Sequence, residues 1–173
     1  MAIRSLPITQ TSAYQMGALA LLLSAGVILT ALGFEHIGGY LPCPLCLMQR
    51  YAYYAGIPLL FLALVLLATD RTGLAQLIFV IVALGFLANA GLGIYHAGAE
   101  WKFWQGPATC AAASGDLATN AGSLLQDLQR VQVIRCDEAA WRFLGLSFAG
   151  WNVPISLLLG AIALRAAMAA RQL

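Results

Sequence analysis

Four long stretches without a charged residue constrain the fold of this 173-residue chain more than any other feature. They lie between Arg4 and Glu35, Arg50 and Asp70, Arg71 and Glu100, and Arg142 and Arg165. Each is close to or longer than the roughly 20 residues that cross a ~30 Å hydrocarbon core as a helix. Helices are expected because backbone polar groups find no water in lipid. We therefore predict an all-α integral membrane protein, a four-transmembrane-helix bundle with helices near 14–34, 50–68, 74–95 and 147–166.

The composition agrees with a membrane protein and excludes other classes. The chain is 61% hydrophobic and only 9% charged, whereas soluble domains are about 25% charged. We expect one membrane domain over residues 1–173, in contact with membrane lipid. A net charge of +2 without a basic run argues against nucleic acid as a partner. The first apolar stretch is longer than the core of a signal peptide, so an uncleaved helix is expected there.

The connections between the predicted helices are very unequal, and they define two sides. Both termini and a tight turn at 70–73 fall on one side, while loops 35–49 and 96–146 fall on the other. Lysine and arginine are almost evenly divided between the sides and do not fix the orientation. All four cysteines lie in the two loops, and disulfides persist outside the cytosol. This favours periplasmic loops and cytoplasmic termini.

The long loop contains a pattern of its own. Ser123 and Gln126 fit a capping box, and apolar residues then recur at helical spacing as far as Val131. A short amphipathic helix is predicted, either lying on the membrane surface or packing against the end of the bundle. The four tryptophans flank the spans, as in an interfacial belt.

The sequence Cys43-Pro44-Leu45-Cys46 is the strongest local signal for chemistry. Two cysteines at this spacing close a reducible disulfide that exchanges by thiolate attack. Cys46 falls where the second helix is expected to begin, and the positive end of a helix dipole favours a thiolate. Arg50 follows one turn later and can add a positive charge beside that thiolate. Without a nearby thiol, Arg50 would be read as an interfacial cation.

Cys110 and Cys136 form the second pair, and two alternatives to redox chemistry apply to them. Together with the first pair they could bind a metal, but structural zinc sites use two close-spaced pairs. Because 25 residues separate Cys110 from Cys136, no metal is expected. The pair could instead be a structural disulfide. A separate CxxC on the same side favours exchange between the two pairs.

Several blocks of the chain together resemble the DsbB family of disulfide-bond-forming quinone reductases. The blocks are Phe34-Glu35-His36, Pro42 to Arg50, His96, Ala108-Thr109-Cys110, and Cys136 with Trp141, Phe143-Leu144-Gly145-Leu146 and Trp151. Their order, the predicted helix count and the loop lengths extend the similarity over nearly the whole chain. The residues between the cysteines and in the rest of the long loop differ from the family pattern.

The resemblance implies an electron relay in the bacterial inner membrane. A DsbA-like periplasmic thioredoxin-fold oxidase attacks the long-loop disulfide and joins Cys110. Cys136 is released and attacks Cys43. Cys46, beside Arg50, then donates electrons to a quinone, ubiquinone or menaquinone, and the quinol feeds the respiratory chain. His96 either hydrogen-bonds the quinone or is an ordinary interfacial histidine, and no role is assigned to His36.

Three other functions are compatible with parts of this pattern. A relative with the same chemistry could serve one dedicated client. An enzyme of the vitamin K epoxide reductase type also combines helices, a CxxC and a quinone, but its CxxC comes late in the bundle. A membrane scaffold with structural disulfides would explain Cys110 and Cys136, but not a CxxC followed by Arg50.

Overall fold

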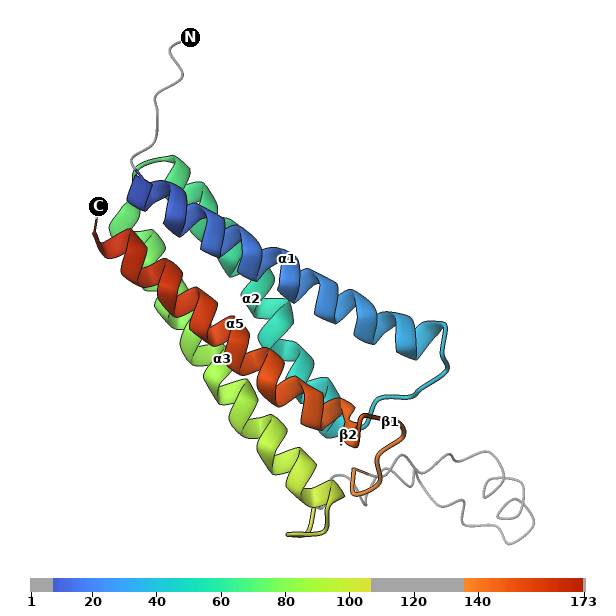
Figure 1. Cartoon of the computed structure of the whole chain (residues 1–173). Helices are drawn as coiled ribbons and strands as arrows, with labels where there is room; N and C mark the ends of the chain where they lie inside the picture. The colour runs from blue at the N-terminus through green and yellow to red at the C-terminus, as the bar shows by residue number, and fades with distance from the viewer. Residues whose placement is uncertain (1–7, 107–135, 173) are drawn as a thin grey trace, which may run out of the picture.

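The computed structural model describes residues 8–106 and 136–172, which form four long helices and one short hairpin (Figure 1). The helices are α1 (Ile8–His36), α2 (Pro44–Ala68), α3 (Thr72–Glu100) and α5 (Phe148–Arg171). All four are long and apolar enough to cross a membrane. The predicted all-α membrane fold with four transmembrane helices is therefore confirmed. The amphipathic helix expected near 123–131 lies outside the described residues.

All four helices extend beyond the spans expected from the charges. Near the cysteines, α2 begins at Pro44 rather than near residue 50, and α3 continues to Glu100 rather than ending near residue 95. Proline is favoured in the first turn because its fixed φ suits a helix and the N–H it lacks needs no partner there. The first charge marks the edge of the hydrocarbon, not the first helical residue. As a result, Cys46 and His96 lie on helices rather than in loops.

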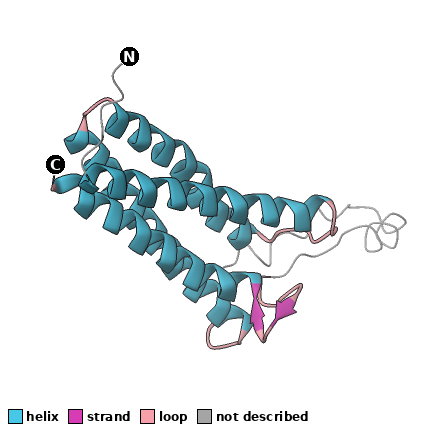
Figure 2. Cartoon of the chain, turned by 45° about the horizontal axis from the view of Figure 1, so that its top comes forward, coloured by secondary structure: helices cyan, strands magenta, loops and turns pink. Residues whose placement is uncertain are grey.

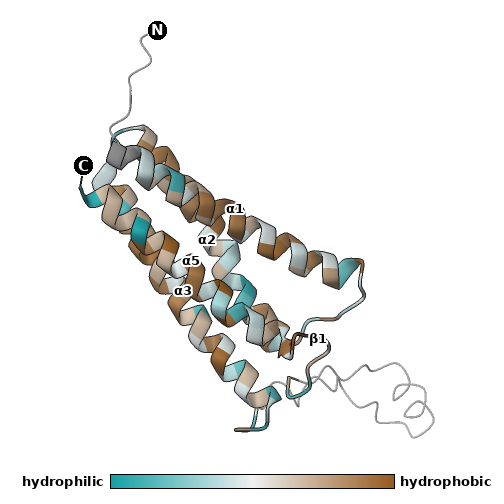
Figure 3. Ribbon diagram, viewed as in Figure 1, coloured by the Kyte–Doolittle hydropathy of each residue, from teal (hydrophilic) through white to brown (hydrophobic). Residues whose placement is uncertain are grey.

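The helices pack through small residues and expose large apolar side chains to lipid. Alanines fill much of the buried core, and the exposed leucines include Leu22 and Leu29, at 70% and 66% exposure. The helices are hydrophobic along most of their length (Figure 3). Gly17 allows α1 to approach its neighbours, because a Cβ there would lie 2.8 Å from the Phe79 ring. Small residues of this kind let membrane helices pack closely where no hydrophobic force between helices is available.

A buried polar cluster joins α2, α3 and α5 in the part of the bundle that adjoins the CxxC end. Asn152 Oδ1 accepts hydrogen bonds from Tyr53 Oη at 2.8 Å, Ser156 Oγ at 3.3 Å and Asn89 Nδ2 at 3.4 Å. Asn89 Nδ2 also donates to Ser156 Oγ at 3.0 Å. Hydrogen bonds of this kind specify how membrane helices pair, since an unpaired polar group in hydrocarbon costs free energy.

We expect Asn152→Ala to lower the free energy of unfolding by about 1–2 kcal/mol, because it removes the acceptor of the buried Tyr53 and Ser156 hydroxyls. The measurement is a reversible unfolding titration in mixed micelles. Ser24→Ala is the matched control, since Ser24 Oγ is buried and has no hydrogen-bond partner. That control is expected to be neutral or slightly stabilising. Equal destabilisation by both variants would contradict the role given to the Asn152 cluster.

A hairpin immediately before α5 was not predicted from the sequence. Strands β1 (Arg142–Phe143) and β2 (Leu146–Ser147) pair antiparallel, and they lie at the end of the bundle where α3 ends and α5 begins (Figure 2). The two connecting residues, Leu144 and Gly145, both have positive φ, at 51° and 83°, as a type I′ turn requires. Ser147 then caps α5 by accepting a hydrogen bond from Gly150 N at 3.1 Å. The hairpin fixes the entry of the chain into the last helix.

Candidate functional site

The CxxC pair is built into the first turn of α2. Cys43 is the N-cap residue, and its Sγ accepts a hydrogen bond from Cys46 N at 3.2 Å. The Sγ atoms of Cys43 and Cys46 lie 2.9 Å apart, and both residues are thiols. Cys43 is buried and Cys46 is partly buried. The site therefore holds a dithiol in which each sulfur is already close to its partner.

The surroundings of Cys43 favour its thiolate, whereas the sequence points to Cys46 as the activated sulfur. The hydrogen bond from the Cys46 side chain, assisted by His96 and the Cys46 backbone N–H, lowers the pKa of Cys43 from 9.0 to about 5 against an opposing effect of burial. From the sequence, the helix dipole and Arg50 are expected to stabilise a thiolate at Cys46. Because α2 starts at Pro44, Cys43 is the N-cap residue, and its sulfur accepts the hydrogen bond of the Cys46 backbone N–H.

His96 comes from the far end of α3 and completes the environment of Cys43. Its Nε2 lies 3.5 Å from Cys43 Sγ, and its Nδ1 lies 2.9 Å from Gln49 Nε2. His96 is 1% exposed. The sequence placed His96 on the thiol side, and the structure brings it into direct contact with a thiol. Gln49, which orients the ring, was not singled out from the sequence.

Arg50 is paired with a residue that the sequence analysis noted only as part of a family pattern. Its guanidinium donates to the Glu35 carboxylate at the end of α1, and both side chains are largely shielded from solvent. The ion pair connects α1 to α2 beside the CxxC. Arg50 therefore carries a compensated charge and also positions α1, a role that the spacing from Cys46 could not reveal.

Cys136 lies against the CxxC although it follows a long loop. It is 1% exposed, forms one buried cluster with Cys43 and Leu45, and is disulfide-bonded. The next residue, Asp137, pairs with Lys102 beyond the end of α3, with 2.6 Å between Nζ and Oδ2. This ion pair helps to hold Cys136 beside α2 and α3. Cys110 lies outside the described residues.

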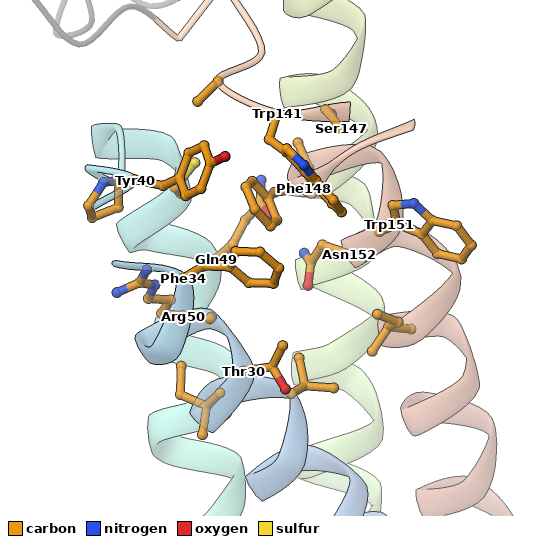
Figure 4. Close-up of a pocket in the computed structure, with 18 of the residues that line it drawn as sticks. Thr30, Phe34, Tyr40, Gln49, Arg50, Trp141, Ser147, Phe148, Trp151 and Asn152 are labelled. Atoms are coloured by element: carbon orange, nitrogen blue, oxygen red, sulfur yellow. The ribbon is translucent and has the colours of Figure 1, made fainter. Parts of the chain in front are cut away.

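A cavity of about 610 Å³ opens beside these thiols. It is enclosed by α1, α2, the end of α3, the hairpin and the start of α5, and both CxxC cysteines, Arg50 and His96 line it. Most of the lining is apolar. Figure 4 shows aromatic rings from α1, the hairpin segment and α5 around the cavity. The centroid of the Phe148 ring lies 5.1 Å from those of Phe34 and Trp141.

Glu100 is a further cavity residue that sequence reasoning missed. It is 8% exposed, and its Oε1 lies 3.7 Å from His96 Nε2, one turn earlier on α3. Glu100 Oε2 is buried and has no hydrogen-bond partner. The only signal available in the sequence was an acidic residue four positions after His96 at the end of an apolar stretch. Helical i, i+4 spacing puts two such residues on one face.

Comparison with known proteins agrees with this arrangement of helices and cysteines. The family model for the disulfide bond formation protein DsbB matches residues 14–166. Disulfide bond formation protein B of Marinobacter nauticus is 30% identical over 150 residues, which cover 82% of this chain and 83% of the relative. Disulfide bond formation protein B 2 of Pseudomonas putida is 31% identical, covering 88% and 89%, and the Methylococcus capsulatus protein is 30% identical, covering 90% and 94%. No solved structure matches the chain significantly.

The extent of these matches assigns the chain to a protein family. The family model covers most of the chain, including all four cysteines, and the relatives are covered over most of their own length. A protein of this family takes part in disulfide bond formation. The chain belongs to the DsbB family of membrane disulfide bond formation proteins.

Proposed function

We propose that this protein reoxidises a DsbA-like dithiol oxidase and transfers the two electrons to a membrane quinone. The observation that carries the proposal is the position of the Cys43–Cys46 dithiol. It lies between the disulfide-bonded Cys136 on one side and an apolar cavity among membrane helices on the other. A pair in this position can exchange with a second disulfide and can also reach a lipid-soluble acceptor.

The first half of the proposed cycle is disulfide exchange. A thiolate of the reduced partner attacks a Cys110–Cys136 disulfide at Cys110, forming a mixed disulfide and releasing the Cys136 thiolate. Cys136 attacks Cys43 of the oxidised CxxC, which releases Cys46. The partner's second thiol displaces Cys110, and Cys110 then attacks Cys136 and releases Cys43. The partner leaves as a disulfide, and both electrons reside on the Cys43–Cys46 dithiol.

The second half is oxidation of that dithiol. A quinone accepts two electrons and two protons and leaves as a quinol for the respiratory chain. The apolar cavity suits a flat ring, and the thiols open into it. Within the site, the Cys43 sulfur is hydrogen-bonded by Cys46 and His96, which favours its thiolate. His96 can take a proton from this pair, since its Nε2 lies 3.5 Å from Cys43 Sγ.

In the proposed cycle, a Cys43–Cys46 dithiol beside a disulfide-bonded Cys136 is the state that follows partner oxidation and precedes oxidation by the quinone. The same disulfide supports placing this end of the bundle in the periplasm of the inner membrane and the termini in the cytoplasm.

The proposal is tested by mixing the purified protein with reduced partner and a soluble quinone and following quinone absorbance. One quinone is expected to disappear for each partner disulfide formed, with sustained turnover. A membrane scaffold with structural disulfides would consume no quinone. Partner oxidation that proceeds without quinone loss would overturn the proposed acceptor.

Arg50→Ala is expected to raise the apparent KM for quinone about 10-fold or more while leaving mixed-disulfide formation with the partner unchanged. In the proposed complex the Arg50 guanidinium donates a hydrogen bond to the quinone. The loss of such a charge-assisted hydrogen bond, worth about 1.5–3 kcal/mol, accounts for an effect of this size. Steady-state kinetics with varied quinone give the KM. Glu35→Gln is the matched control, because it keeps a hydrogen-bonding partner for Arg50 but removes the opposing charge. Equal KM values for Arg50→Ala and the unmodified protein would sink the assignment.

A further inference from the structure

Three soft or borderline metal ligands converge at the end of the cavity. Cys43 Sγ, Cys46 Sγ and one ring nitrogen of His96 all lie within 4.8 Å of one another. Two cysteines and a histidine are a ligand set that zinc uses in proteins. The site differs from the four-cysteine arrangement considered from the sequence, because its third ligand comes from α3 rather than from the long loop.

The separations between these atoms are close to those of a tetrahedral site. Zinc bonds of about 2.3 Å to sulfur and about 2.0 Å to nitrogen or oxygen put neighbouring ligand atoms roughly 3.3–3.8 Å apart. Cys43 Sγ lies 3.5 Å from His96 Nε2, and Glu100 Oε1 lies 3.7 Å from the same nitrogen. The two sulfurs, at 2.9 Å, must separate by somewhat less than 1 Å. Rotation of the partly buried Cys46 side chain can supply that movement.

Two neighbours of His96, Glu100 and Gln49, also have the chemistry that such a metal site needs. Glu100 is buried beside His96 with an unpartnered oxygen. Its carboxylate lies outside the group of three ligand atoms, so it must turn toward the thiols to serve as the fourth ligand. Gln49 contacts His96 Nδ1 at 2.9 Å, leaving Nε2 to face the ion. With its amide turned, Gln49 accepts the Nδ1 proton, and this kind of support commonly orients metal-binding histidines.

Charge and access also favour an ion in this position. All four ligand residues line the same cavity, so an ion can reach them without unfolding of the bundle. Both cysteines bind the ion as thiolates, so binding displaces any proton that either sulfur still holds, and the two negative charges reduce the cost of holding a divalent cation away from water. A disulfide between the same cysteines offers no thiolate. Metal binding and disulfide formation are therefore mutually exclusive.

We propose that the dithiol form binds one zinc-like divalent cation through Cys43, Cys46, His96 and Glu100, and that this cation blocks oxidation of the pair. The proposal concerns an inhibitory site of the reduced protein rather than a resident cofactor. It requires only the reduced CxxC, so it stands or falls separately from the identity of the electron acceptor.

The test uses Co²⁺ as a spectroscopic probe of the full-length, reduced protein in detergent, followed by competition with Zn²⁺. Cys110→Ser/Cys136→Ser is the background, so that only the CxxC thiols remain. We expect one ion per chain, thiolate-to-cobalt charge-transfer absorption and the visible bands of tetrahedral cobalt. Oxidation of the CxxC is expected to abolish the signal. Absence of one-to-one binding by the reduced protein would overturn the proposal.

Variants distinguish this site from adventitious binding. His96→Ala is expected to weaken binding at least about 100-fold, and Gln49→Leu about 10–100-fold, as for other residues that orient a ligand. His36→Ala is the matched control, because His36 is exposed at the end of α1, and its affinity should be unchanged. Thermal melting checks that each variant is folded. Equal affinity in folded His96→Ala, or in the oxidised protein, would place the ion elsewhere.

The functional consequence is measured separately, without changing the protein. Zn²⁺ is expected to slow oxidation of the pre-reduced CxxC by quinone in proportion to occupancy, and a chelator should restore the rate. Normal oxidation at saturating Zn²⁺ would contradict the inhibitory role. Because cobalt binding is recorded without quinone or partner, a failure of the relay would not affect that result.

Discussion

Cys46→Ser is expected to reduce quinone consumption to the uncatalysed background. The variant keeps a hydrogen-bond donor beside Cys43 but removes the sulfur with which Cys43 closes its disulfide. Without that disulfide, the two electrons received from the partner have no two-electron route to an acceptor. The measurement is the loss of quinone absorbance with reduced partner in excess.

Two controls make this result specific to the sulfur of Cys46. Cys46→Ala should abolish turnover as completely as the serine variant, although it also removes the donor. Met48→Ser replaces the sulfur of a neighbouring residue that is 52% exposed on the same helix, and its rate should be unchanged. Turnover of Cys46→Ser at the rate of the unmodified protein would mean that another thiol reduces the quinone.

The second large effect is expected in the pH dependence of Cys43. Its pKa is lowered from 9.0 to about 5, so its thiolate persists until the pH falls through about 5, whereas an ordinary cysteine loses it below about 9. At pH 7 the thiolate fraction of Cys43 should exceed that of an unperturbed cysteine by about 30- to 100-fold, and at pH 6 by more than 100-fold. The measurement is the rate of alkylation of the reduced protein against pH, with a chelator present and the modified residue identified by mass spectrometry.

The same experiment separates the causes of the pKa shift. Cys46→Ala removes the largest contribution, the hydrogen bond from the Cys46 side chain, and should move the alkylation midpoint of Cys43 upward. Cys46→Ser retains an O–H donor and should move it less. Midpoints in both variants equal to that of the unmodified protein would show that the backbone and His96, rather than the Cys46 side chain, lower the pKa of Cys43.

The sequence was most informative where one local property decides the structure. Charge-free stretches predict membrane helices because the cost of a charge in hydrocarbon applies at every position. The CxxC predicts a reactive pair because its spacing alone allows the disulfide. Pro44 indicates that α2 starts early, whereas the charge of Arg50 marks only the edge of the hydrocarbon.

Contacts between residues far apart in the chain could not be predicted from the sequence, for a physical reason. The pairing of Glu35 with Arg50, and the approach of His96 to Cys43, depend on the rotation and tilt of helices packed mainly through alanine and glycine. Uniformly apolar helices carry little amphipathic signal to fix that rotation. The orienting contact from Gln49 and the placement of Glu100 follow from the same rotation. The sequence places Cys136 on the thiol side, but its burial against Cys43 and Leu45 is a contact between residues far apart in the chain.

The splayed end of α1 has a consequence for how the acceptor is supplied. α1 diverges from α5 toward its His36 end (Figure 1), and both helices contribute to the lining of the cavity. The lipid-soluble acceptor proposed above would reach such a cavity by diffusion within the plane of the bilayer rather than through water. The quantity that governs saturation is then its mole fraction among lipids or detergent molecules. Dilution of the whole suspension leaves that mole fraction unchanged, whereas added empty micelles lower it. Two assays with equal molar quinone but different amounts of detergent therefore saturate the protein to different degrees.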